Sequence, residues 1–244
     1  MTGTGRPTGV RALLGASATV TLATVVVNLL SYVLVAVGTR VLGPERYGEL
    51  AALLGLLAVG AVPALTLQVV LARRVAAGEP GGLGRAAGYS AVVVTVVAAA
   101  AVPVLHLSLR ISVPALILMT VALPAMTLIA APMGVVQGLH LFGRLAAVTV
   151  IAVGGRVGGA IIGLVAFGTS VATMAGMAAG AWLAVLAGAL AVRGPGWAAL
   201  VARNGVRALA EVGHAAVTML AFAALTTVDV LLAKRYLPAT DAGL

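Results

Sequence analysis

The feature that most constrains this sequence is a series of long apolar stretches. A helix that crosses a bilayer needs about 20 mainly apolar residues. Seven stretches meet this requirement: 13–37, 49–71, 86–107, 113–136, 145–167, 170–192 and 214–233. The sequence therefore predicts an all-α, polytopic membrane protein with about seven transmembrane helices.

The composition agrees with a membrane protein and excludes an ordinary soluble domain. Hydrophobic residues make up 62% of the chain and charged residues 9%, with a mean hydropathy of +1.17. A soluble domain carries about 25% charged residues and has no means of burying so much apolar surface. In a bilayer, lipid solvates the outer faces of helices whose backbone hydrogen bonds are satisfied internally. The lipid bilayer is thus the first expected partner.

The basic residues indicate topology, not a nucleic-acid partner. The formal charge is +9, but the 15 basic residues form no basic run, and all except Arg156 lie outside the apolar stretches. With the amino terminus inside, nine fall on the inner side: Arg6, Arg11, Arg73, Arg74, Arg85, Arg144, Arg193, Arg203 and Arg207. Five fall on the outer side: Arg40, Arg46, Arg110, Lys234 and Arg235. Because basic residues concentrate in cytoplasmic loops, the amino terminus is expected in the cytoplasm. Ala, Gly, Val and Arg are abundant, which suggests a GC-rich bacterial genome. The expected location is therefore the bacterial cell membrane.

These spans and loops divide the chain into four expected parts. Residues 1–12 form a cytoplasmic tail, and residues 13–192 form a six-helix transmembrane lobe. Residues 193–213 form a cytoplasmic linker, and residues 214–244 form a seventh helix with its outer end. A short motif, Arg-x-Leu-x5-Gly, follows the first span at Arg40 and the seventh at Arg235. Such a repeat predicts two parallel halves, as in several transporter folds.

Two segments resemble a known family. Residues 28–74, which include Arg-Val-Leu-Gly-Pro-Glu-Arg-Tyr-Gly from Arg40 to Gly48, resemble the start of bacterial polysaccharide biosynthesis proteins. These are oligosaccharide-lipid flippases of the multidrug and polysaccharide exporter superfamily. Residues 228–243 resemble the opening of that family's second lobe. The resemblance implies a two-lobed exporter fold of about twelve to fourteen helices. It also implies transfer of a polyprenyl-diphosphate-linked oligosaccharide across the membrane.

The chain reaches Leu244, where that family would continue with further helices. Either a longer protein supplies the second lobe, or two copies pair to complete the path. Three alternative functions also remain. The first is a drug or cation exporter of the same superfamily, the second is a membrane-embedded enzyme of glycan biosynthesis, and the third is a non-transporting membrane fragment.

Arg156 is the most informative single residue, because it falls near the middle of the fifth apolar stretch. An unpaired charge at that depth is costly, so the side chain is expected to face protein or water. One interpretation is an anion site for the diphosphate of a lipid-linked sugar, since a guanidinium offers bidentate donors. The other is a structural arginine bonded to backbone carbonyls or to an acid.

A polar stripe runs along the first span. Its members recur at intervals of three and four residues: Ser17, Thr21, Thr24, Asn28 and Ser31, with Tyr32 beside them. This spacing puts them on one helical face. We expect that face to point into the bundle, where it either lines an aqueous path or joins helices through hydrogen bonds.

Asp229 is the other charge within a span, and it lies close to the predicted outer end of the seventh helix. It is expected to serve as a coupling-ion site or as a charge partner of Arg156, unless it is simply a wetted interfacial carboxylate. Arg40, Glu45 and Gln68 either gate a path or anchor helix ends at the interface.

Glycine seams predict close helix packing in the fifth and sixth spans. Gly155, Gly159 and Gly163 share one helix face, as do Gly176 and Gly180 on the next helix. No metal is expected, since His106, His140 and His214 lack metal-ligand spacing and the chain has no cysteine. No enzyme activity or cofactor is expected either, since no pair of acids occupies a predicted exposed loop.

Overall fold

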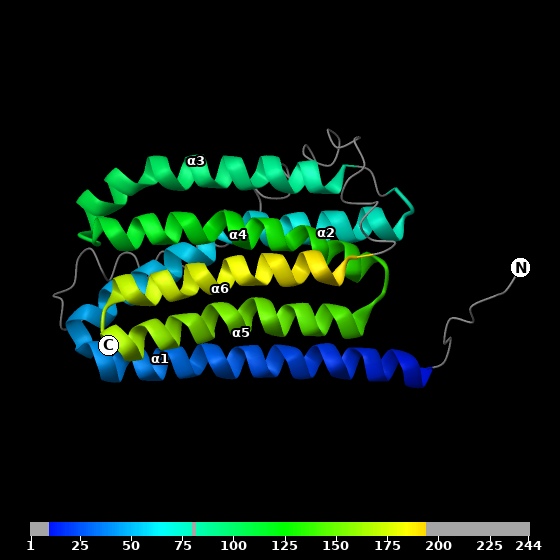
Figure 1. Cartoon of the computed structure of the whole chain (residues 1–244), viewed down its shortest axis with the longest axis horizontal. Helices are drawn as coiled ribbons and strands as arrows, with labels where there is room; N and C mark the ends of the chain where they lie inside the picture. The colour runs from blue at the N-terminus through cyan, green and yellow to red at the C-terminus, as the bar shows by residue number, and fades with distance from the viewer. Residues whose placement is uncertain (1–9, 80–81, 194–244) are drawn as a thin grey trace, which may run out of the picture.

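The computed structural model describes residues 10–79 and 82–193, and the regular secondary structure of this part of the chain is all α-helix (Figure 1). Its helices are α1 (Val10–Gly60), α2 (Val62–Ala76), α3 (Leu83–Leu109), α4 (Val113–Gly138), α5 (Phe142–Phe167) and α6 (Ser170–Ala191). The side chains of residues 10–20 and of Glu45 are outside the description. The predicted seventh span, 214–233, and nearly all of the linker 193–213 also lie outside the described residues.

The long helix α1 contains a chain reversal at Gly43. This glycine has φ 68° and ψ 173°, a backbone conformation that favours glycine, and Pro44 follows it. The reversal separates span 1 (Thr21–Pro44) from span 2 (Arg46–Ala76). The predicted spans 13–37 and 49–71 leave residues 38–48 as an outer loop, but helix occupies both sides of a tight turn at Gly43.

Span 2 consists of the second half of α1 and the whole of α2, with a short break at Ala61. Pro63 lies at the start of α2 and lacks a backbone N–H, which explains why the regular hydrogen bonding is interrupted there. In Figure 1 the chain crosses behind α4 and α6 as it passes from the end of α1 into α2. Span 2 thus starts beside span 1 and ends against α4.

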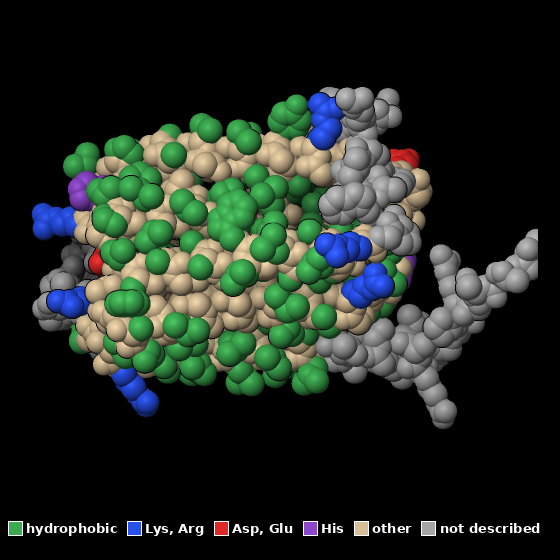
Figure 2. Space-filling view, viewed as in Figure 1, with side chains coloured by type: hydrophobic (Ala, Val, Ile, Leu, Met, Phe, Trp, Pro, Cys, Tyr) green, Lys and Arg blue, Asp and Glu red, His purple; other side chains and the backbone are tan. Residues whose placement is uncertain are grey.

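Six helices in the described residues are long and apolar enough to cross a membrane. They correspond to the first six predicted spans, so the prediction of a polytopic helical protein is confirmed at this level. Many of their large apolar side chains face outward: on α3, Val92, Val96 and Val97 are each more than 60% exposed. Figure 2 shows hydrophobic side chains across the middle of the visible face and basic ones near its two ends. This surface suits lipid contact.

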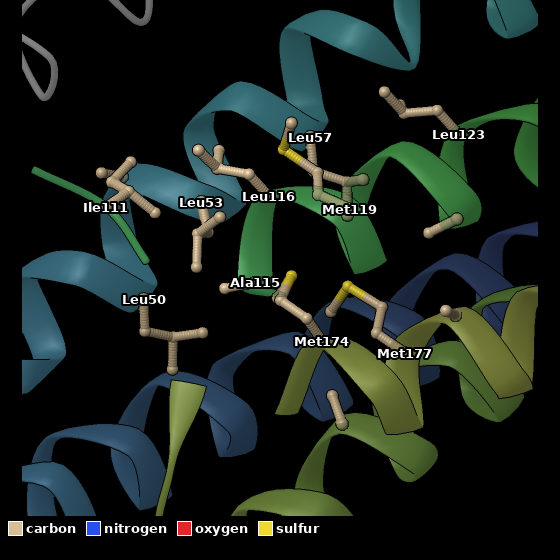
Figure 3. Packing of buried hydrophobic residues seen from close by; sticks show 14 of the residues in the cluster. Leu50, Leu53, Leu57, Ile111, Ala115, Leu116, Met119, Leu123, Met174 and Met177 are labelled. Carbon is tan, nitrogen blue, oxygen red and sulfur yellow. The ribbon is translucent and has the colours of Figure 1, made fainter. Parts of the chain in front are cut away.

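The main core lies between span 2, α4 and α6. Leu50, Leu53 and Leu57 of span 2 pack against Ala115, Leu116 and Met119 of α4 (Figure 3). Met174 and Met177 of α6 close the cluster from the opposite side. The core therefore ties the first half of span 2 to α4 and α6.

Helices α5 and α6 are joined by a seam of glycines. Gly155, Gly159 and Gly163 of α5 face Gly180, Gly176 and Ala172 of α6 in antiparallel register. At each of these positions on α5 the nearest atom to an added Cβ would be the backbone carbonyl oxygen opposite. The close packing predicted from the glycine spacing is thus confirmed, and the two seams prove to be one interface.

The carboxylate of Glu49 joins three elements at the end of the bundle opposite the α2–α3 connection. It accepts hydrogen bonds from the Ser112 N–H at 2.9 Å, from the Ser112 hydroxyl at 2.7 Å and from the Ser170 hydroxyl at 3.1 Å. Ser112 precedes α4 and Ser170 begins α6, so the negative charge lies at two helix N-termini, where the macrodipole favours it. Glu49 is not among the site residues predicted from the sequence.

Candidate functional site

A partly open cavity of about 320 Å³ lies within the bundle. Its walls come from span 2, α4, α5 and α6, and are mainly small or apolar: Ala58, Ala61, Ala64, Leu65, Gln68, Met126, Ile129, Ala130, Met133, Ala152, Val153, Arg156, Ala181 and Ala184. Two polar side chains, Gln68 and Arg156, stand out among them. A concave, mostly apolar site with a few polar groups is the usual form of a small-molecule site.

Arg156 projects from the middle of α5 onto the cavity wall. Its Nη1 donates to the Met126 sulfur at 3.3 Å, and its buried Nε has no hydrogen-bond partner among the described residues. A guanidinium has five N–H donors, and a thioether is a weak acceptor. Within the described part of the chain, the structural interpretation of Arg156, bonding to carbonyls or to an acid, is therefore not observed.

Gln68 contributes the second polar group. Its Nε2 donates to Gln137 Oε1 at 3.0 Å, which joins span 2 to α4. The backbones approach closely here, because a Cβ added at Gly134 would lie 2.8 Å from the Gln68 carbonyl oxygen. Gln68 is therefore held in position on the cavity wall. From the sequence, Gln68 is predicted only as a gate or an interfacial anchor, since nothing in the local sequence reveals its partner on a distant helix.

The polar stripe of span 1 is placed differently from the prediction. Thr21, Thr24, Asn28 and Tyr32 are exposed on the surface of the described bundle, with Tyr32 77% exposed. Ser31 is half-buried, and its hydroxyl donates to the Val27 carbonyl at 3.0 Å. The expectation that this face points into the bundle is wrong for the six described helices. The side chain of Ser17 lies outside the description.

The position of Gly38 shows which helix lies beside the end of the polar face nearest the turn. Gly38 comes seven residues after Ser31, and therefore lies on the same face of the helix. A Cβ added at Gly38 would be 3.2 Å from the Tyr47 ring and 3.4 Å from Leu50, both on span 2. Span 1 therefore lies beside span 2 near their turn, at the Gly38 end of the polar face. Ala58 and Leu65 of span 2 are exposed and also line the cavity. The open side of the cavity therefore lies along an exposed face of span 2.

The remaining predicted site residue, Asp229, lies outside the described residues. Among the residues that are described, no group of three or more His, Cys, Asp or Glu side chains could hold a metal ion. Comparisons with protein families, curated proteins and solved structures found no match to this chain.

Proposed function

We propose that the chain is a transport module in polysaccharide export. It would form the amino-terminal lobe and seventh helix of a flippase that moves a polyprenyl-diphosphate-linked oligosaccharide across the bacterial cell membrane. The single observation that carries the proposal is the under-bonded guanidinium of Arg156 on the wall of a mid-span cavity. The family resemblance supplies the substrate class.

Arg156 suits the diphosphate for a chemical reason. A guanidinium presents planar paired donors that match two phosphate oxygens, and a charge-assisted bond is about twice as strong as a neutral one. The Arg156 Nε, which has no partner among the described residues, lies in a site with few competing polar groups. A bound phosphate would provide both a countercharge and hydrogen-bond acceptors. The Gln68 amide would donate a further hydrogen bond to the phosphate, either in place of its bond to Gln137 or in addition to it.

The polar face of span 1 suits the sugar part of this substrate. Hydroxyl and amide side chains exposed toward lipid would be unfavourable, and they are better satisfied against water, sugar or another helix. Near the turn at Gly38 this face lies beside span 2, and the exposed Ala58 and Leu65 of span 2 line the cavity. We propose that a second lobe or a second copy of the chain covers this side, and that the two units rock against each other by alternating access.

The proposed orientation places the amino terminus in the cytoplasm, so substrate would enter from the end with the α2–α3 and α4–α5 connections. Asp229 would act as a coupling-ion site or as a charge partner of Arg156. Its proposed role rests on the sequence alone.

The test is Arg156→Ala, introduced into the gene in the cell that makes the protein. The expected result is loss of surface polysaccharide with accumulation of its lipid-linked precursor, while the abundance of the protein in the membrane stays normal. Arg46→Ala is the matched control, because it removes the same charge from an exposed position outside the cavity. Unchanged surface polysaccharide in the Arg156→Ala cells would overturn the role assigned to this residue.

A further inference from the structure

A second cavity, of about 200 Å³, lies at the end of the bundle where α4 ends, α5 begins and α6 ends. Leu139 and Leu141 contribute to its apolar wall, and both are more than a third exposed. Arg144 and Arg193 are the charged residues that line it. The cavity thus combines an apolar wall with two exposed cations.

Arg144 is held in place over this cavity by the C-terminus of α6. Its Nη1 donates to the carbonyl oxygen of Ala191 at 3.2 Å, a bond that also suits the negative end of the helix dipole. Arg193 follows two residues later on the same wall. No carboxylate lines this cavity among the described residues. Glu49 is bonded to Ser112 and Ser170, and Glu79 lies in the connection between α2 and α3. The two guanidinium charges are therefore without a carboxylate partner among the described residues.

The depth of the cavity also matters. It lies where three apolar spans end, which is the level of lipid headgroups for helices of this length. Arg73, Arg74 and Arg85 lie at the ends of helices on the same side of the bundle. Basic pockets between transmembrane helices at a membrane surface favour anionic headgroups.

We propose that this cavity binds an anionic phospholipid, with Arg144 and Arg193 on its phosphate and with Leu139 and Leu141 against the start of an acyl chain. The shared chemistry of the ligand is a phosphate group, and the apolar wall is the reason for assigning a lipid and not free phosphate. This site is separate from the Arg156 cavity and does not depend on the proposed transport function.

The test is native mass spectrometry of the full chain in detergent with phosphatidylglycerol and phosphatidylcholine of identical acyl chains. The chain should retain phosphatidylglycerol preferentially. Arg144→Ala with Arg193→Ala should weaken that binding roughly 10- to 30-fold, as expected for two arginines near a phosphate. The paired control is Arg40→Ala with Arg46→Ala, which removes two exposed charges from the opposite end of the bundle and should leave binding unchanged.

Arg193→Ala alone separates lipid binding from folding, because it keeps the bond between Arg144 and Ala191. It should weaken phosphatidylglycerol binding about fivefold with an unchanged thermal unfolding midpoint. Inorganic phosphate, titrated alone and in competition with the lipid, should neither bind measurably nor displace it. Equal binding of both phospholipids, equal loss in the paired control, or full displacement by inorganic phosphate would each overturn the proposal.

Discussion

Gly159 of α5 lies so close to Gly176 of α6 that a Cβ on either residue would clash with the backbone of the other. Gly159→Ala should therefore force the two helices apart and lower the free energy of unfolding by roughly 1–3 kcal/mol. Gly158→Ala is the matched control, because a Cβ at that position would meet no neighbouring atom within 4 Å. Thermal unfolding in detergent checks the pair. Equal unfolding midpoints for the two variants would show that the seam is not tightly packed.

Glu49 should contribute strongly to stability, because its carboxylate accepts three hydrogen bonds from the start of α4 and the start of α6. Glu49→Ala should lower the free energy of unfolding by about 2–3 kcal/mol, since it leaves these donors without their charged acceptor. The free energy of unfolding of Glu49→Gln should lie between those of the natural chain and Glu49→Ala, because the amide keeps one acceptor oxygen. Glu79→Ala removes an exposed carboxylate and should change stability by less than about 0.5 kcal/mol. A Glu49→Ala variant as stable as the Glu79→Ala variant would refute this role.

The bundle was predictable from sequence because each described helix carries its own signal. Apolar length marks the six spans, and glycine spacing marks the α5–α6 interface. The contacts of Glu49, Gln68 and Arg156 were not predictable. Their partners lie on distant helices, and a single sequence does not specify which helices are neighbours. Ser112, directly before the fourth span, was the one local signal for this contact of Glu49, since serine is a common helix N-cap.

The polar stripe shows a different limit. Its spacing correctly places Thr21, Thr24 and Asn28 on one side of span 1, but periodicity reveals a shared face and not what covers it. In the described bundle this face is exposed. The interior face of span 1 is instead formed by small and apolar residues such as Ala23 and Leu34.

The charge of the cavity can be measured with single cysteines, because the chain has none of its own. Val153→Cys lies on the cavity wall one helical turn from Arg156. Its thiol should react about tenfold faster with an anionic methanethiosulfonate than with a cationic one, because the guanidinium raises the local anion concentration. Arg156→Ala in the same background should abolish the preference. Ala160→Cys, which replaces a fully buried residue on the same helix, should stay unreactive.

A reactive Ala160→Cys would mean that the bundle is looser than described. If Val153→Cys shows the same charge preference with and without Arg156, the guanidinium does not set the potential of the cavity.

The orientation can be tested at the two ends of span 2. Arg46→Cys lies at its start and Glu79→Cys lies just beyond its end, and both positions are exposed. With the amino terminus in the cytoplasm, a membrane-impermeant maleimide should label Arg46→Cys on intact cells and Glu79→Cys only after lysis. The reverse pattern would place the amino terminus outside.

The role of Arg156 as the phosphate site can be tested by the binding of a polyprenyl diphosphate to the purified full chain, measured for the natural sequence and for Arg156→Ala. Arg156→Ala should weaken binding roughly 30-fold or more, Arg156→Lys should restore part of it as a point charge, and Arg46→Ala should have no effect. If the Arg156→Ala chain is folded and binds the diphosphate as tightly as the natural chain, the cavity is not the phosphate site and the proposed function is wrong in its central step.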